Sequence, residues 1–179
     1  MDANSILTFW FEEITPKDWW RKSAQFDADL RRRFDTVLQA ARRGELKHWC
    51  ESASGCLALV IVLDQFSRNI YRDKPEAFAA DAQALAIAQL AVNRGFDKSL
   101  PSERRNFLYM PYMHSEDADI HVEAVALFAS LAGENSEDFE LRHKAIIDRF
   151  GRYPHRNKIL GRTSTAEELV FLQEPGSAF

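Results

Sequence analysis

The sequence predicts an all-α fold of about eight helices in stacked antiparallel pairs. Apolar residues recur at helical spacing along most of the chain, and no convincing stretch alternates between apolar and polar residues as a half-buried strand does. Glycine and proline residues lie where these periodic stretches begin or end. Because the connections between them are short, neighbouring helices are expected to run antiparallel.

Length and composition indicate a single globular domain. The chain has 179 residues, the size of one ordinary domain, so residues 1–179 are expected to fold as one all-α unit. Hydrophobic residues at 46% and charged residues at 28% exclude an intrinsically disordered chain. The longest apolar run, Cys56 to Leu63, is too short to cross a membrane, and the net charge of −4 argues against general nucleic-acid binding. A soluble, cytoplasmic protein is expected.

The first forty residues predict two helices. Residues 4–13 form a short helix that ends before Pro16, because a capping Asn-Ser pair precedes an aromatic cluster. From Trp19 to Ala41, apolar residues recur at spacings of three and four, which predicts one amphipathic helix. Its three consecutive arginines, Arg31 to Arg33, point 100° apart, so we expect a solvated face and not one patch.

Residues 54–72, SGCLALVIVLDQFSRNIYR, are apolar for eight residues and then abruptly polar. The apolar part alone fits either a buried strand or a helix packed on all sides. We favour a helix because Asp64, Arg68 and Arg72 follow one another at intervals of four and share one stripe. Asn69 falls on the next stripe.

The rest of the chain carries clear helix start and stop signals. Proline opens two of these helices, and a capping box of Thr165 and Glu168 opens the last. Further helices are expected from Pro75 to a stop at Gly95, from Ser102 with a kink or end at Pro111, from Asp117 to Leu131 with a stop at Gly133, from Ser136 to Phe150, and from Ala166 to Leu172.

Basic charge is concentrated near the C-terminus. Residues 142–162 hold five arginines and two lysines against one acid, Asp148, in a chain of net charge −4. Gly151 and Pro154 force a turn within FGRYPHRN, and LGR follows shortly afterwards. Local basic excess attracts anions. The candidate residues presented here are Arg152, His155, Arg156, Asn157 and Arg162.

Two roles are open for these arginines. Guanidinium groups repel one another unless acids or a bound anion lie between them. Pairing with carboxylates from the acidic remainder of the chain would fix the C-terminal segment to the body of the protein. Bidentate contacts to a phosphate or carboxylate would instead make a ligand site. A nucleic-acid patch is the least favoured role.

A second candidate motif is LDQFSRNIYR, residues 63–72. Asp64 emerges directly from the apolar run, and a buried carboxylate requires a charged or hydrogen-bonding partner. Arg68 lies one helical turn further on and is the expected partner. The pair is either a buried structural ion pair or part of a site.

The third motif is MPYMHSEDADIH, residues 110–121. His114, Asp117 and His121 share one helical face, which is a loose spacing for metal ligands, and no second ligand cluster accompanies them. His114 and Glu116 are alternatively a general acid and base, or the start of a helix cap. No metal or cofactor is predicted. His143 shares a face with apolar residues and is expected to be a core histidine.

Three motifs together, LDQFSRNIYR, FLYMPYMHSED and HKAIIDRFGRYPHRNKILGRTSTAEELVFL, resemble the bacterial domain-of-unknown-function family 924. The resemblance runs nearly end to end, from LTFWF to FLQEP. It implies a tetratricopeptide-like right-handed α-α superhelix and brings no activity, cofactor or catalytic residue. The family motif includes residues 114–117 but not His121, and Ser67 stands where proline is expected.

The favoured hypothesis is that these motifs converge on one polar pocket for an anionic small molecule or a peptide carboxylate. The expected binding residues are Asp64, Arg68, Asn69, Arg152, Arg156, Asn157 and Arg162, with His114, Glu116 and His155 as catalytic candidates. One alternative is a metal-independent hydrolase or lyase acting through His114 or His155. Another is a protein-protein interaction module, because helical stacks commonly bind proteins.

Overall fold

The computed structural model describes residues 1–131 and 136–178, which form α-helices joined by short 3₁₀ and π segments, with no strand in these ranges. The predicted all-α fold is therefore confirmed. The expected stop at Gly133 lies outside the described residues. No helix in the described ranges has both the length and the apolarity that a membrane span requires. The tetratricopeptide-like superhelix stays a prediction.

The N-terminal part contains α1 (Ala3–Thr8), which continues into a π segment, α2 (Pro16–Trp20) and α3 (Ala24–Arg42). The single helix predicted from Trp19 onwards is wrong in this respect, because the chain breaks between α2 and α3. Ser23 explains the break, since its hydroxyl accepts a hydrogen bond from the Phe26 amide and caps α3.

The centre of the protein is one nearly continuous helix. α4 (Ala53–Ile61) leads into a π segment, Val62–Phe66, and then into α5 (Ser67–Ile70). Its apolar residues are buried on all sides, so the helix that we favoured over a strand is present. The π segment widens the helix where Asp64 lies, and such irregularities are frequent at functional sites.

The second half of the chain follows the predicted order. α7 passes through Pro111 and ends two residues later, while α9 has the predicted bounds and Gly151, at φ +66°, ends it. The capping box of Thr165 and Glu168 opens the last helix. The helices are α6 (Asp81–Asn93), α7 (Ser102–Met113), α8 (Ala118–Ala129), α9 (Ser136–Phe150) and α10 (Ala166–Phe171).

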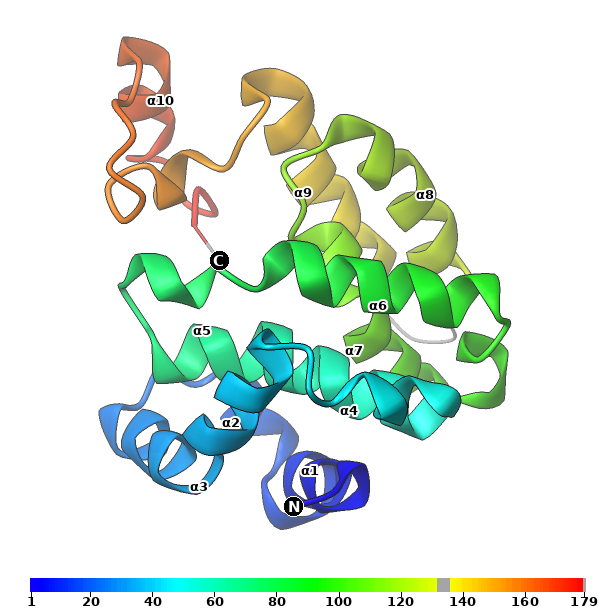
Figure 1. Cartoon of the computed structure of the whole chain (residues 1–179). Helices are drawn as coiled ribbons and strands as arrows, with labels where there is room; N and C mark the ends of the chain where they lie inside the picture. The colour runs from blue at the N-terminus through cyan, green and yellow to red at the C-terminus, as the bar shows by residue number, and fades with distance from the viewer. Residues whose placement is uncertain (132–135, 179) are drawn as a thin grey trace.

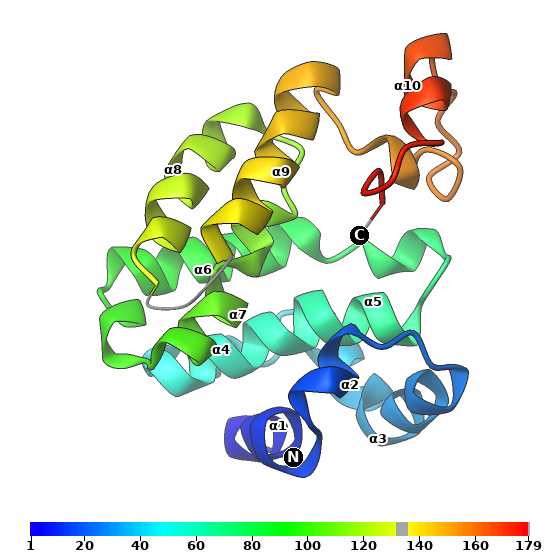
Figure 2. The same cartoon turned by 180° about the vertical axis from the view of Figure 1, so that it is seen from behind.

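The helices pack around α4, which contacts α1, α6 and α7, while α8 packs against both α7 and α9 (Figure 1). Seen from behind, α8 and α9 run side by side, and the segment with α10 extends from the end of α9 (Figure 2). The main core includes Trp10, Phe34, Phe66 and Phe107. A second, smaller cluster of Ile146, Ile147 and Tyr153 joins α9 to the C-terminal segment.

Candidate functional site

Asp64 is a deeply buried polar residue of the site and is 1% exposed. Its Oδ1 lies 2.7 Å from His114 Nδ1 at the end of α7, and Gln65 Nε2 donates to Oδ2 at 2.7 Å. Burial alone would raise the pKa of Asp64, but the positive charge of Arg68 and the contact with His114 lower it below its usual value. Asp64 is therefore a buried carboxylate.

Arg68 links this carboxylate to a second one. Its Nη1 lies 2.9 Å from Asp64 Oδ1, and its two terminal nitrogens contact both oxygens of Asp81 at 2.8 and 3.0 Å. Asp81 is the first residue of α6, so this bidentate contact joins α5 to α6. The expected Asp64–Arg68 pair is present, and Arg68 is neutralised on two sides.

Arg156 reaches the same carboxylate from the C-terminal segment. It lies in a 3₁₀ turn, Pro154–Arg156, where its Nη1 is 3.3 Å from Asp81 Oδ2 and its Nη2 donates to the His114 carbonyl at 3.0 Å. Its guanidinium carbon is 4.7 Å from the ring centroids of Phe78 and Tyr153. The side chain is buried, and its Nε has no hydrogen-bond partner.

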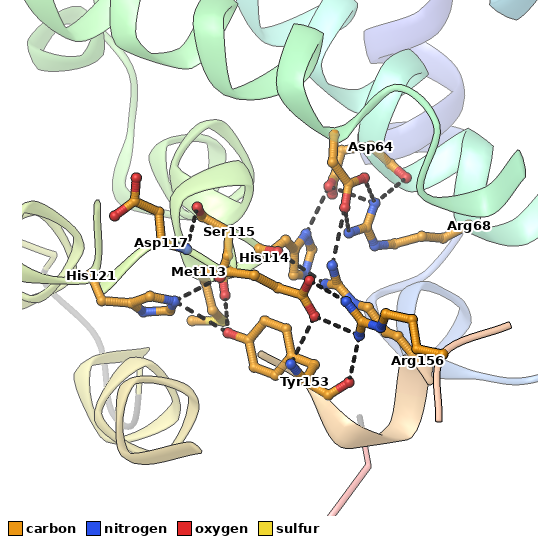
Figure 3. A network of polar contacts seen from close by, with 12 residues as sticks. Asp64, Arg68, Met113, His114, Ser115, Asp117, His121, Tyr153 and Arg156 are labelled. Carbon is orange, nitrogen blue, oxygen red and sulfur yellow. Dashed lines mark hydrogen bonds and ion pairs between the residues drawn. The ribbon is translucent and has the colours of Figure 1, made fainter. Parts of the chain in front are cut away.

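The electrostatic environment of Arg156 is unfavourable for its charge. Burial lowers the pKa of Arg156, and repulsion from Arg68 lowers it further, while Asp81 opposes both effects. The structure thus brings Asp64, Arg68, His114 and Arg156 together from three separate parts of the chain (Figure 3).

His114 belongs to this cluster, and a second histidine, His155, lies next to Arg156 in the sequence. Burial lowers the pKa of His114 and repulsion from Arg68 adds to this effect, while the contact with Asp64 opposes it. Burial likewise lowers the pKa of His155 to about 4, with repulsion from Arg156 as the next cause. The His155 ring lies 5.6 Å from that of Tyr153. Both imidazoles are therefore neutral at pH 7, a state in which histidine can accept a proton.

Glu116 is bound by residues of the C-terminal segment. Arg162 contacts both of its oxygens, at 2.6 and 2.9 Å, and the Tyr153 amide donates to Oε1 at 2.7 Å. Burial would raise the pKa of Glu116, but these two donors lower it. Glu116 is thus an ionised anchor for the turn that presents Arg156.

Arg152 and Asn157 form a separate network around Glu168. Arg152 contacts both oxygens of Glu168 at 2.6 and 2.8 Å, and Asn157 donates to Oε2 at 3.2 Å. Arg162 connects the two networks, because its Nε donates to Asn157 Oδ1 at 2.9 Å. These contacts fix α10 to the turn that follows α9.

Asn69 does not reach the cluster. Its Nδ2 donates to the Gln65 carbonyl at 2.8 Å, and its Oδ1 accepts from Arg72 at 2.7 Å. Arg72 pairs with Asp27 of α3 at 2.6 Å, so the prediction that it shares a stripe with Asp64 is wrong. The helical spacing fails here because α5 ends at Ile70, before Arg72.

The residues with a loose metal-ligand spacing at the start of α8 bind other protein groups. His121 Nδ1 lies 2.6 Å from Glu140 Oε1 and its Nε2 lies 2.9 Å from the Ser115 carbonyl, while Asp117 caps α8. The described residues contain no group of three His, Cys, Asp or Glu side chains placed to hold a metal ion. His143 is buried and donates to the Phe139 carbonyl, as a core histidine does.

Sequence reasoning missed Asp81 and Phe78, which complete the cluster. Asp81 begins a helix in an alanine-rich stretch and resembles an ordinary first-turn acid. Phe78 lies beside both arginines, with its ring centroid 5.7 Å from the Arg68 guanidinium carbon. Neither residue carries a local sequence signal for this role. Each predicted arginine pairs with an acid: Arg68 with Asp64 and Asp81, Arg152 with Glu168, Arg156 with Asp81, and Arg162 with Glu116.

Comparisons with known proteins identify relatives but no activity. No curated protein matches the chain. The chain is similar to a solved structure of a protein of unknown function, ATU0120 from Agrobacterium tumefaciens, with 38% identity, a TM-score of 0.91 and coverage of 96% of both chains. The family model described as "Bacterial protein of unknown function (DUF924)" matches residues 6–176, and the chain therefore belongs to this family.

Proposed function

We propose that the protein binds a small oxyanion, the carboxylate or phosphate group of an anionic metabolite or peptide, at Arg156. The observation that carries the proposal is the incomplete bonding of this buried guanidinium. Its Nε has no partner, and its contact with Asp81 is longer, at 3.3 Å, than either contact of Arg68 with the same carboxylate. A buried, underbonded charge is costly unless a ligand compensates it.

The surroundings of Arg156 suit a planar, bidentate ligand group. The ring centroids of Phe78 and Tyr153 each lie 4.7 Å from the guanidinium carbon. Because a guanidinium group donates hydrogen bonds in its own plane, a ligand oxyanion would meet the edge of this group. The neutral His114 borders the same position and adds no competing positive charge. In the proposed complex the ligand oxyanion takes the place of the Asp81 carboxylate beside Arg156, and Asp81 remains with Arg68.

The role of Arg152, Asn157 and Arg162 is different in this proposal. They hold the C-terminal segment through Glu168 and Glu116, and so they position the turn that carries Arg156. This combines the two roles that the sequence leaves open. Arg152 and Arg162 form structural ion pairs, and Arg156 binds the ligand.

Calorimetric titration with phosphate, acetate and a tripeptide with a free or an amidated C-terminus tests the proposal. Arg156→Lys keeps the charge but removes the fork, and we expect it to weaken oxyanion binding about tenfold. Arg149→Lys is the matched control, because Arg149 pairs with the exposed Glu167 and lies outside the cluster. Equal affinities in these two variants, or no binding by the parent protein, would show that the proposal is wrong.

The contact between His114 and Asp64 favours a second candidate function, a metal-independent hydrolase or lyase. When Nδ1–H is donated to the Asp64 carboxylate, the lone pair of Nε2 is available as a base. In a hydrolysis, Nε2 would take one proton from water while the hydroxide attacks the anionic substrate, and the proton would return to the leaving group.

Turnover of a panel of phosphorylated and carboxylated metabolites separates the second candidate from binding alone. His114→Gln should abolish any turnover and leave oxyanion affinity nearly unchanged, because Arg156 remains. Ligand binding without turnover by the parent protein would leave only the binding function. A protein-interaction role stays a prediction.

A further inference from the structure

A surface hollow of about 410 Å³ lies between α3 and the end of α5, away from the contacts of Asp64 and His114. The two elements that border it, α3 and α5, pack against each other (Figure 1). Its size is within the range of small-molecule sites. The residues that line it are Ala24, Asp27, Ala28, Arg31, Arg32, Asn69, Ile70 and Arg72.

The lining of this hollow carries more positive than negative side chains. Three arginines face one acid, and that acid, Asp27, is already engaged by Arg72 at 2.6 and 2.8 Å. Arg32 pairs with Asp29, which does not line the hollow, at 2.8 Å. Positive charge on the walls of a concave surface raises the local concentration of anions.

Arg31 is the arginine with capacity left for a ligand. No carboxylate of the described residues lies within ion-pair distance of its guanidinium, which donates to the Ile70 carbonyl and lies 5.5 Å from the ring centroid of Tyr71. These two contacts orient the group without neutralising it. A guanidinium held in this way can offer its remaining donors to an oxyanion.

The other walls indicate what the ligand carries besides its charge. Ala24 and Ala28 lie one turn apart on α3 and give the hollow a small, apolar wall. Asn69 is fixed by its contacts with Gln65 and Arg72. The combination suits a compact molecule with an apolar part beside an oxyanion.

We infer that this hollow is a second anion-binding site, which accepts a small organic phosphate or carboxylate through Arg31. The site is independent of the binding proposed at Arg156, because no residue is shared between the two. α5 joins them in sequence, with Arg68 in the buried cluster and Asn69 in the hollow.

Titration with phenyl phosphate, benzoate and inorganic phosphate tests the inference. Phenyl phosphate and benzoate combine an apolar ring with an oxyanion, so the tighter of the two identifies the preferred anion, and inorganic phosphate should bind more weakly than phenyl phosphate. Ala28→Glu places a carboxylate on the exposed wall at a helix-compatible position and should weaken binding about tenfold. Arg31→Ala should have a similar effect.

Arg43→Ala is the matched control, because Arg43 pairs with Glu45 after α3 and does not line the hollow. We expect its affinity to stay within about twofold of the parent value. The same titrations in Arg156→Lys separate the two sites, since the effect of Ala28→Glu should persist there. The inference is wrong if the parent protein binds none of the three probes, or if Ala28→Glu and Arg43→Ala bind alike.

Discussion

The guanidinium groups of Arg68 and Arg156, which come from α5 and from the turn after α9, contact the same carboxylate. Asp81 supplies it, with two short contacts to Arg68 and one longer contact to Arg156. The two cations repel each other, and Asp81 separates them. One acid thus joins the centre of the protein to its C-terminal segment and leaves the second arginine incompletely satisfied.

Asp81→Asn should tighten oxyanion binding at Arg156, because it removes the internal carboxylate that competes with the ligand. The amide retains a hydrogen-bond acceptor for Arg68, and Asp64 still balances that charge. We expect about tenfold higher affinity for phosphate, together with a loss of roughly 1–3 kcal/mol in the free energy of unfolding. Calorimetry and urea unfolding measure the two effects. A purely structural cluster would show the loss of stability and no gain in affinity.

Glu168→Ala should destabilise the protein by releasing the contacts that hold the C-terminal segment. Glu168 is buried and accepts hydrogen bonds from Arg152, Asn157 and the Thr165 amide, so its removal leaves several donors without their acceptor. We expect a loss of about 2–4 kcal/mol in the free energy of unfolding. Glu167→Ala is the control, because that residue is exposed and contacts only the exposed Arg149. Comparable losses in the two variants would contradict the role assigned to Glu168.

The helices could be predicted because their signals are local. The bounds of α9 and the capping box of α10 follow from residues that are close in the sequence. The break before α3 lacks a glycine or proline, and the capping hydroxyl of Ser23 resembles any other polar residue in an amphipathic stretch. Arg31, Arg32 and Arg33 are exposed, as expected of a solvated face, and two of them also have partners: Arg31 donates to the Ile70 carbonyl and Arg33 pairs with Glu13.

The site could be predicted only in part because the pairing of charges depends on the tertiary fold. Unbalanced arginines and an acid at the end of an apolar run identify Asp64, Arg68 and Arg156 as residues that need partners. The sequence does not say which acid each arginine meets. Asp81 faces two arginines because α6 packs against the π segment beside Asp64, and no local pattern encodes that contact.

Gly55→Ala should destabilise the protein because the space beside this residue is filled by backbone. A Cβ at Gly55 would lie 1.8 Å from the Trp49 carbonyl oxygen, so α4 or the preceding 3₁₀ turn would have to move. Overpacking of this kind typically lowers the free energy of unfolding by about 1–3 kcal/mol. We expect a loss at the upper end because the close atom belongs to the backbone and not to a flexible side chain. Urea unfolding measures the change. Ala53→Gly in the same helix is the control for helix propensity. If Gly55→Ala loses no more free energy of unfolding than this control, the close approach at Gly55 is contradicted.

Stability should fall as the pH is lowered from 7 to 5, before the carboxylates begin to titrate. Burial lowers the pKa of His143 to about 3 and that of His155 to about 4, whereas an unfolded chain has a histidine pKa near 6.5. The unfolded state therefore binds more protons below pH 6.5, so the stabilising effect is complete above that value and is lost as the pH falls towards the folded pKa. Each histidine contributes a slope of at most about 1.4 kcal/mol per pH unit.

Urea unfolding at pH 7, 6 and 5 checks this dependence, and His143→Gln should reduce its slope because it removes one imidazole whose pKa is lowered by burial. His48→Gln is the control, since His48 is exposed. The carboxylates with lowered pKa, such as Asp64 and Glu116, stay ionised in the folded state across this interval and affect stability mainly below about pH 5. A slope that is the same in the parent protein and in His143→Gln would show that His143 is not held neutral by burial.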